Sequence, residues 1–333
     1  MSEVTSMSKV FQTILLQALP ASGKSEVRNF LANVEPKRLE EEFHIGANLQ
    51  LDDYPYVNFM REIDTALEAV HQPRIFYPSN DKPLIDGRDW ATFINLLNED
   101  YHNLHNRVTV HPDSYALYLF ERMDRAAMGA GMDARIANLD DGVRKAIAQR
   151  LEEPARKIIT DLEAQYPDSF DNKTLIIECS RGGKDGSTLP LTGTMGYQFS
   201  LPYLSNDLLE NAVILYILVT PEQSRAKNFA RSEGNTDQSS NLFHGVPLDV
   251  MLGDYGCDDM LWLIEHSEVK DTVTVNAHGK TYHLPVGVFD NRVDATSFLR
   301  RDKKTWTEDE VNAVTRGIRQ ATDTMWAKLN QKH

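Results

Sequence analysis

The sequence predicts an α/β protein with a mostly parallel, five-stranded sheet covered by helices in three layers. Strand-like apolar runs alternate with helix-like segments, which is typical of this fold class. The length of 333 residues suits either one large domain with an insertion or two domains. The five expected strands are Gln12–Ala18, Ala47–Leu51, Thr174–Cys179, Ala212–Val219 and His283–Phe289.

The turn after the first strand has the pattern of a phosphate-binding P-loop. It reads Leu19-Pro20-Ala21-Ser22-Gly23-Lys24-Ser25, and Val27, Phe30 and Leu31 then recur at helical spacing. Backbone N–H groups of such a turn and of the following helix N-terminus converge on an anion. We therefore expect the six residues from Pro20 to Ser25 to hold nucleotide phosphates, with Lys24 on the β- and γ-phosphates and Ser25 on Mg²⁺.

Two other interpretations of this segment were weighed. Ala18 stands where the motif has its first glycine, so a chance match has to be considered. A secretory signal is the second, because Lys9 precedes an apolar run. That run contains Gln12, Thr13 and Gln17 and leads into a lysine-bearing helix, which favours the phosphate-binding turn.

More than a hundred residues separate the second and third strands, far more than a simple crossover needs. Residues 75–170 are predicted to form a helical insertion that contributes to the substrate region. We expect helices over Trp90–Tyr101, Ser114–Met128 and Leu139–Gln165, the last with a break before Pro154. Candidates for lining a substrate pocket are Arg88, Trp90, Tyr101, His102, His105, Arg107, Tyr115, Arg122 and Arg125.

The second strand ends in the paired carboxylates of Asp52 and Asp53, followed by Tyr54. A carboxylate there would face the γ-phosphate, where it could accept a hydroxyl proton or hold a metal-bound water. A solvated turn with a helix cap is the alternative.

Together, Ala21-Ser22-Gly23-Lys24-Ser25 and Asp52-Asp53-Tyr54 resemble the uridine kinase, phosphoribulokinase and glycerate kinase branch of P-loop kinases. The resemblance implies the P-loop NTPase three-layer sandwich. It gives Asp52 the position of the catalytic aspartate, and Asp53 that of the neighbouring Ser or Asp.

The third strand ends in Glu178-Cys179-Ser180-Arg181, an acid at the end of an apolar run in the manner of a Walker B segment. Glu178 and Asp53 are the candidates for orienting Mg²⁺ beside Ser25, and Arg181 is expected to point toward phosphate. The order of these residues also loosely resembles the E-R-S motif of deoxynucleoside kinases.

After the fourth strand, Thr220-Pro221-Glu222-Gln223 predicts a helix start with a capping box. Its charged residues Arg225, Lys227 and Arg231 are candidates for covering the phosphates, and Arg231 is preferred because it lies nearest the expected lid, residues 232–260. A turn with a helix cap at Asp258 or Asp259 is expected within the acidic run Asp254–Asp259, and the last helix is expected over Glu308–Leu329.

The net charge of −14 argues against nucleic-acid and anionic-membrane partners. No apolar stretch reaches spanning length, and Cys179 and Cys257 are far apart with no C-x-x-C, so a reducing cytoplasm is expected. A GTPase is disfavoured because Asn172-Lys173-Thr174-Leu175 lacks the aspartate of the guanine motif. The sequence leaves open whether the chain forms a homodimer.

The main hypothesis is an ATP- and Mg²⁺-dependent kinase that phosphorylates a hydroxyl of an unidentified small molecule. Lys24, Asp52, Arg181 and Arg231 are its expected catalytic residues, in a single domain covering residues 1–333. The alternative is a regulatory or assembly ATPase that binds nucleotide without a small-molecule acceptor.

Overall fold

The computed structural model describes residues 9–233 and 245–332, and its centre is a six-stranded sheet in the order β2-β3-β1-β4-β6-β5. All neighbouring strands pair in parallel except β5 and β6. The strands are β1 (Thr13–Gln17), β2 (Ala47–Asp52), β3 (Lys173–Glu178), β4 (Ala212–Leu218), β5 (Thr272–Ala277) and β6 (Lys280–Asp290). The α/β class with a mostly parallel sheet is therefore confirmed.

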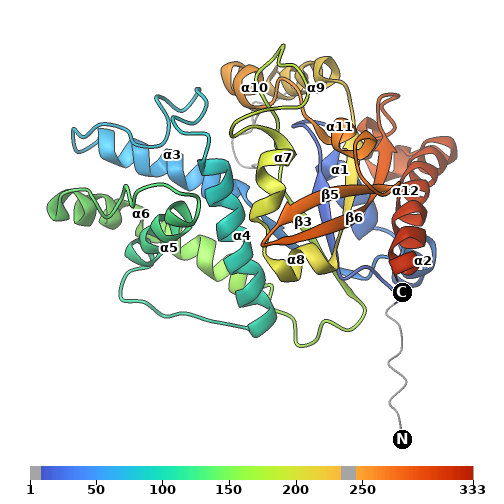
Figure 1. Ribbon diagram of the computed structural model, residues 1–333, viewed down its shortest axis with the longest axis horizontal. Helices are drawn as coiled ribbons and strands as arrows, with labels where there is room; N and C mark the ends of the chain where they lie inside the picture. Colours follow the sequence, from blue (N-terminus) through green and yellow to red (C-terminus); the bar gives the residue numbers. More distant parts are fainter. Residues whose placement is uncertain (1–8, 234–244, 333) are drawn as a thin grey trace, which may run out of the picture.

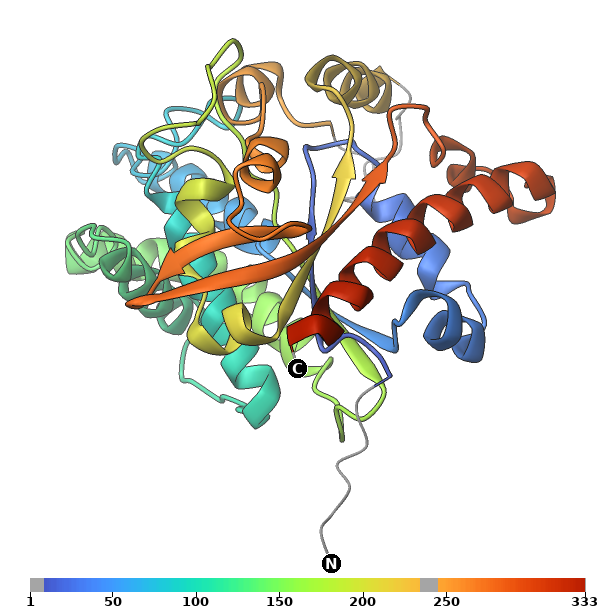
Figure 2. The same cartoon turned by 45° about the vertical axis from the view of Figure 1, so that its right-hand side comes forward.

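The expected count of five strands is wrong, because β5 adds a sixth at the edge. β5 pairs antiparallel with β6 through the two-residue turn His278-Gly279, and both turn residues have positive φ, 52° and 74°. Two left-handed residues are what a tight hairpin turn needs to match the twist of its strands. The hairpin crosses the front of the molecule in Figure 2. Alternating Val273, Val275 and Ala277 carried the signal that the sequence analysis missed.

Successive residues of the central strands point to opposite faces of the sheet and so enter two different cores. Ile14 and Leu16 pack with helices α1 (Lys24–Ala32), α2 (Pro36–Phe43) and α12 (Glu308–Leu329), whereas Leu15 joins the core of the other face. Helices therefore cover both faces of the sheet (Figure 1). The elements of the second face are α4 (Asp89–Asn106), α7 (Gly196–Ser200), η1 (Leu201–Tyr203), α8 (Asn206–Asn211) and α11 (Met260–Glu265).

Four helices fill the connection between β2 and β3, as expected of the insertion. They are α3 (Tyr54–Glu68), α4, α5 (Tyr115–Gly129) and α6 (Asp141–Glu163), and they gather at one side of the sheet (Figure 1). They share a core of their own with α3 and α6 in direct contact. This packing places α3 and α6 beside the end of β2, where the three elements line a cavity.

The predicted break of α6 at Pro154 is wrong, because the helix continues through it. A proline inside a helix removes one backbone hydrogen bond and strains the preceding turn. The buried residues Ile147, Leu151, Ala155 and Ile159 lie on both sides of Pro154. Burial of this continuous apolar stripe offsets the cost of the proline.

The segments after β4 begin with α9 (Pro221–Glu233), whose predicted capping box is present: the Gln223 amide donates to Thr220 Oγ1 and the Thr220 amide to Gln223 Oε1. The last helix, α12, has the predicted bounds. Part of the predicted lid, residues 234–244, lies outside the described residues. The other elements are α10 (Leu248–Asp254), η3 (Ser297–Arg300), η4 (Lys303–Thr305) and η5 (Asn330–Lys332).

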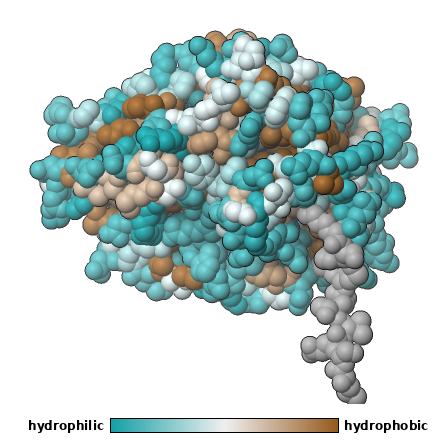
Figure 3. Space-filling model, viewed as in Figure 1, coloured by the Kyte–Doolittle hydropathy of each residue, from teal (hydrophilic) through white to brown (hydrophobic). Residues whose placement is uncertain are grey.

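Hydrophilic residues cover most of the face seen in Figure 3, and hydrophobic residues lie on it in separate small groups. Among the described residues, none of the helices has both the length and the apolar character needed to cross a membrane.

Candidate functional site

The site lies where the turns after β1 and β3 meet. These two strands are parallel neighbours, but β1 leads into α1 on one face of the sheet and β3 leads towards α7 on the other. Open α/β sheets bind ligands at such a reversal, beyond the carboxyl ends of the strands. The Lys24 Nζ donates to Ser180 Oγ at 2.5 Å and so links the two strand ends.

The turn from Ala18 to Gly23 contains two residues in the left-handed region, Ala21 with φ 56° and Gly23 with φ 109°. A Cβ on Gly23 would lie 2.6 Å from Thr296 Oγ1 and 2.9 Å from Asn291 Nδ2. Both the backbone conformation and the space therefore require glycine at this position.

Three other elements hold the carbonyl groups of the turn. The Ser224 hydroxyl donates to the Pro20 carbonyl at 2.7 Å, and Asn291 Nδ2 donates to the Ser22 carbonyl at 2.7 Å. Tyr197 Oη donates to the Ala18 carbonyl at 3.4 Å. The turn is thus fixed from α7, α9 and the segment after β6 before any ligand arrives.

Helix α1 starts directly after this turn, and its N-cap residue is Gly23, which has no side chain to cap the N-terminus. Its first N–H groups have no partner within the helix, and the helix dipole makes this end positive. Ser25 is its second residue. An uncapped N-terminus behind a fixed turn is suited to an anion.

Arg231 lies beside the first turn of α1, where Glu26 accepts from its Nη2 at 3.0 Å. Arg300 bonds to the same carboxylate. Although burial opposes it, the two guanidinium groups lower the pKa of Glu26. Two arginines against one carboxylate leave a net positive charge next to the helix N-terminus.

Asp52 ends β2 directly opposite Glu178 on β3. Its Oδ1 accepts the Tyr54 amide N–H at 2.8 Å. Burial, and then the charges of Glu178 and Asp53, raise the pKa of Asp52 to about 7, while Tyr54 and Lys24 oppose the rise. A carboxyl group with this pKa can take up and release a proton near neutral pH.

Glu178 makes an ion pair with Arg28 of α1, 2.5 Å between Oε1 and Nη1. The same Arg28 nitrogen donates to Gln50 Oε1 at 3.1 Å. The charge of Glu178 is therefore balanced by an arginine, and Arg28 connects the second turn of α1 to the ends of β2 and β3.

Asp53 lies in a closed wall that is formed with Arg181, Ser200 and Trp90. Its Oδ2 lies 2.6 Å from Arg181 Nη1, and Arg181 is 1% exposed. The guanidinium also donates to the carbonyl of Ser180 at 2.7 Å and to Ser200 Oγ at 3.1 Å, and it lies 4.8 Å from the centre of the Trp90 ring. The structure brings Asp53 and Arg181 together as a buried, hydrogen-bonded pair.

The remaining charged candidates of α9 form ion pairs elsewhere, Arg225 with Asp185 at 2.8 Å and Lys227 with Asp294 at 2.8 Å. Among the candidates in the helical insertion, Arg122 is buried and pairs with Asp100 at 2.6 Å. Its role is to hold the insertion together.

The acidic run after α10 supports helix ends, as expected for Asp258 and Asp259. Asp258 accepts the amide N–H of Met260, the first residue of α11, and a bond from Tyr216 Oη. Asp259 accepts the amides of Tyr197 and Gln198 in α7. Burial raises the pKa of Asp258 to about 6.

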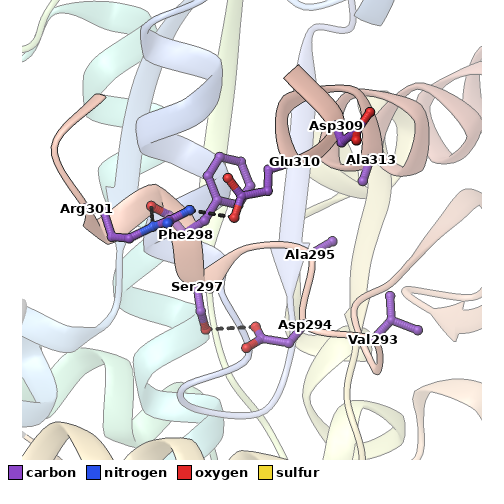
Figure 4. A pocket seen from close by; sticks show the side chains of 9 residues that line it. All are labelled: Val293, Asp294, Ala295, Ser297, Phe298, Arg301, Asp309, Glu310 and Ala313. Carbon is purple, nitrogen blue, oxygen red and sulfur yellow. Dashed lines mark hydrogen bonds and ion pairs between the residues drawn. The ribbon is translucent and has the colours of Figure 1, made fainter. Parts of the chain in front are cut away.

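Two hollows adjoin these groups. A cavity of about 460 Å³ is lined by Asp52 together with residues of α1, α3 and α6. An open depression of about 590 Å³ lies between η3 and the start of α12, beside the Asn291–Thr296 segment that supports Gly23. Figure 4 shows Phe298 and Ala295 at its wall and the ion pair of Arg301 with Glu310 at its rim.

The described residues contain no group of three or more His, Cys, Asp or Glu side chains arranged to hold a metal ion. The two carboxylates predicted to bind metal each form an ion pair with a different arginine: Asp53 with Arg181, and Glu178 with Arg28. Both cysteines, Cys179 and Cys257, are free.

Sequence reasoning missed three residues of the site: Arg28, Glu26 and Asn291. Arg28 lies one helical turn after Lys24, and that spacing could have identified it. Asn291 follows the end of β6, the same position relative to its strand as the other site residues. No local sequence pattern indicates that Glu26 pairs with two arginines that are distant in sequence.

Models of protein families, curated proteins and solved structures were compared with the chain, and none of them matches it.

Proposed function

We propose that the protein is an ATP-dependent kinase that transfers the γ-phosphate to a hydroxyl group of a small molecule, in the P-loop NTPase fold. One observation carries the proposal: the fixed turn with left-handed Gly23 delivers Lys24 and the uncapped N-terminus of α1 to the reversal point of the sheet. Turns of this kind bind polyphosphate through backbone N–H groups and a lysine.

In this proposal the phosphates lie over the first turn of α1. Lys24 contacts the β- and γ-phosphates, and the surplus positive charge of Arg231 and Arg300 favours the anion. Mg²⁺ takes few ligands from proteins and keeps several waters, so the Ser25 hydroxyl and the phosphates suffice to hold it. Glu178, which pairs with Arg28, would act on its waters, whereas Asp53 is enclosed with Arg181 and is given no contact with the metal in this proposal.

Asp52 is the proposed general base. As the acceptor oxygen attacks the γ-phosphorus, its proton passes to the Asp52 carboxylate. The new O–P bond forms while the bond between the γ-phosphorus and the bridging oxygen breaks, and ADP leaves with that electron pair. Arg181 touches no open surface, so it acts as a positioning residue that holds Asp53 and the Ser180 carbonyl.

The depression in Figure 4 is the proposed place of the nucleotide base. The loop that supports Gly23 and Ser22 continues into its wall, so phosphate and base would be held by one connected segment. The two free cysteines agree with a reducing cytoplasm as the proposed location.

Titration calorimetry with Mg-ATP tests the first step. The unaltered protein is expected to bind, and Lys24→Ala to lose binding by about ten-fold or more. Lys37→Ala is the matched control, because Lys37 is an exposed lysine of α2. Absence of a magnesium-linked heat with the unaltered protein would reject nucleotide binding and all roles assigned above.

ADP formation tests the second step. An acceptor that accelerates ADP release supports the kinase. Hydrolysis that no acceptor accelerates, together with nucleotide-dependent association of the protein, would instead support a regulatory ATPase.

A further inference from the structure

The charged side chains that line the cavity beside Asp52 indicate the charge of the acceptor that fits there. Its volume of about 460 Å³ falls in the range of small-molecule sites. Its walls are the end of β2, the first half of α3, the middle and end of α6, and Arg28 of α1. Because Asp52 lines it, an acceptor hydroxyl bound there could meet the proposed base.

The two cations of the lining are already neutralised. Arg28 pairs with Glu178 at 2.5 Å and donates to Gln50. Lys157 lies 2.6 Å from Asp161 on the next turn of α6. An anionic acceptor, such as a hydroxy acid or a sugar phosphate, would find no free cation among the described residues of this cavity.

Two carboxylates of the lining lack such a partner. In the part of the chain that the structure describes, Asp52 accepts the Tyr54 amide and Glu62 accepts Asn58 Nδ2 at 2.9 Å, but neither makes an ion pair. Burial raises the pKa of Glu62 as it raises that of Asp52. Carboxylates that are partly buried without a cation are stabilised by a ligand that supplies one.

Asp52 and Glu62 line one cavity, and Tyr54 lines it with them. Burial raises the pKa of the Tyr54 phenol, and the charges of Asp52 and Glu62 raise it further against the opposing charge of Arg61. Arg61 does not line the cavity; its guanidinium lies over the Tyr77 ring at 4.1 Å and donates to the Asn80 carbonyl. Tyr54, Asn58 and Glu62 follow at four-residue spacing, so they form one face of α3.

We propose that the acceptor is a small polyhydroxylated molecule with a protonated amine, of the amino sugar or amino alcohol class. Its hydroxyl lies at Asp52 and its ammonium group at Glu62, and Tyr54, Ile158 and Leu162 pack against its carbon skeleton. The inference rests on the proposed kinase function, because it concerns the acceptor of that reaction.

The test compares three charges on two scaffolds. Glucosamine, glucose and glucuronic acid form one set, and 1-amino-2,3-propanediol, glycerol and glyceric acid form the other. ADP release with Mg-ATP and direct binding by calorimetry are both measured. The amine of at least one set is expected to bind about ten-fold or more tightly than its neutral and anionic counterparts, and to accelerate ADP release most.

Glu62→Gln is expected to reduce the preference for amine over neutral acceptor to near one. Glu153→Gln is the matched control, an exposed glutamate of α6 outside the cavity lining, and it should keep the preference. Tyr54 remains in both variants, so a loss confined to Glu62→Gln reports on charge.

The outcomes separate the two claims. Equal or stronger use of the neutral or anionic compounds, or no binding of either amine while ATP binds, overturns the acceptor class and leaves the kinase standing. Failure of the protein to bind ATP rejects the proposed function itself.

Discussion

Asp52 and Asp53 are neighbours in the chain but belong to two different regions of the molecule. Asp53 faces a closed wall, where Arg181 satisfies it and is itself held by Ser180, Ser200 and Trp90. Asp52 lines an open cavity, where none of the described residues forms an ion pair with it and burial raises its pKa to about 7. Similar groups with such different surroundings take different roles, the paired one in structure and the unpaired one in chemistry.

The largest expected effect tests the cavity side. Asp52→Asn removes the proposed base and is expected to lower acceptor-dependent ADP formation by about 10²–10⁴-fold. The melting temperature at pH 8 should not fall, because the variant removes an uncompensated buried charge. Steady-state kinetics and thermal denaturation measure the two effects.

Asp171→Asn is the control for this variant, since Asp171 is an exposed aspartate that does not line the cavity. Acceptor-dependent activity that survives in Asp52→Asn would show that Asp52 is not the base, and that Asp52 and Asp53 do not differ in role as proposed.

On the wall side the expected effect is on stability. Asp53→Asn leaves the guanidinium of Arg181 buried without its counter-charge, and the free energy of unfolding is expected to fall by about 3–5 kcal/mol. Urea denaturation measures it. Arg181→Met combined with Asp53→Asn should lose less than the sum of the two single variants, because no charge is then left alone. Additive losses would argue against the pair.

The difference between the two aspartates was beyond the reach of the sequence. The alternating strands, the turn before Lys24 and the bounds of α12 depend on local patterns, and these were predicted. The partner of Asp53 lies 128 residues away, and only the pairing of β2 with β3 brings them together.

The errors in the fold have the same origin. Packing carries α6 through Pro154, and the edge strand β5 depends on a two-residue turn that was not recognised. The role assigned to Asp52 came from its position and from a resemblance, neither of which revealed the raised pKa.

The pH dependence of the reaction sharpens the comparison further. Asp52 accepts a proton only when ionised, so kcat/KM for the acceptor should fall as pH drops below about 7, approaching ten-fold per pH unit. Mg-ATP binding measured by calorimetry over the same range is the control, and it should vary less. A profile that stays flat from pH 8 to pH 5.5 would be incompatible with Asp52 as the base.

Asp254 provides the smallest and most selective test, because it does not line the cavity and none of the described residues forms an ion pair with it. Burial raises its pKa to about 7, with Arg61 opposing the rise. Between the unfolded value of 3.8 and this value, the folded protein binds the proton that the unfolded chain has lost. Its contribution to stability is therefore fully present at low pH and is lost as pH rises toward 7.

Asp254→Asn should reduce this pH-dependent loss of stability by about 2–3 kcal/mol between pH 5 and pH 8, measured by urea denaturation at each pH. The same variant should not change the pH at which kcat/KM for the acceptor falls. A raised pKa without access to the cavity then changes only stability, whereas at Asp52 it changes the reaction as well. A shift of the pH at which kcat/KM falls in Asp254→Asn would contradict this separation, because a residue outside the cavity would then be setting the pKa of Asp52.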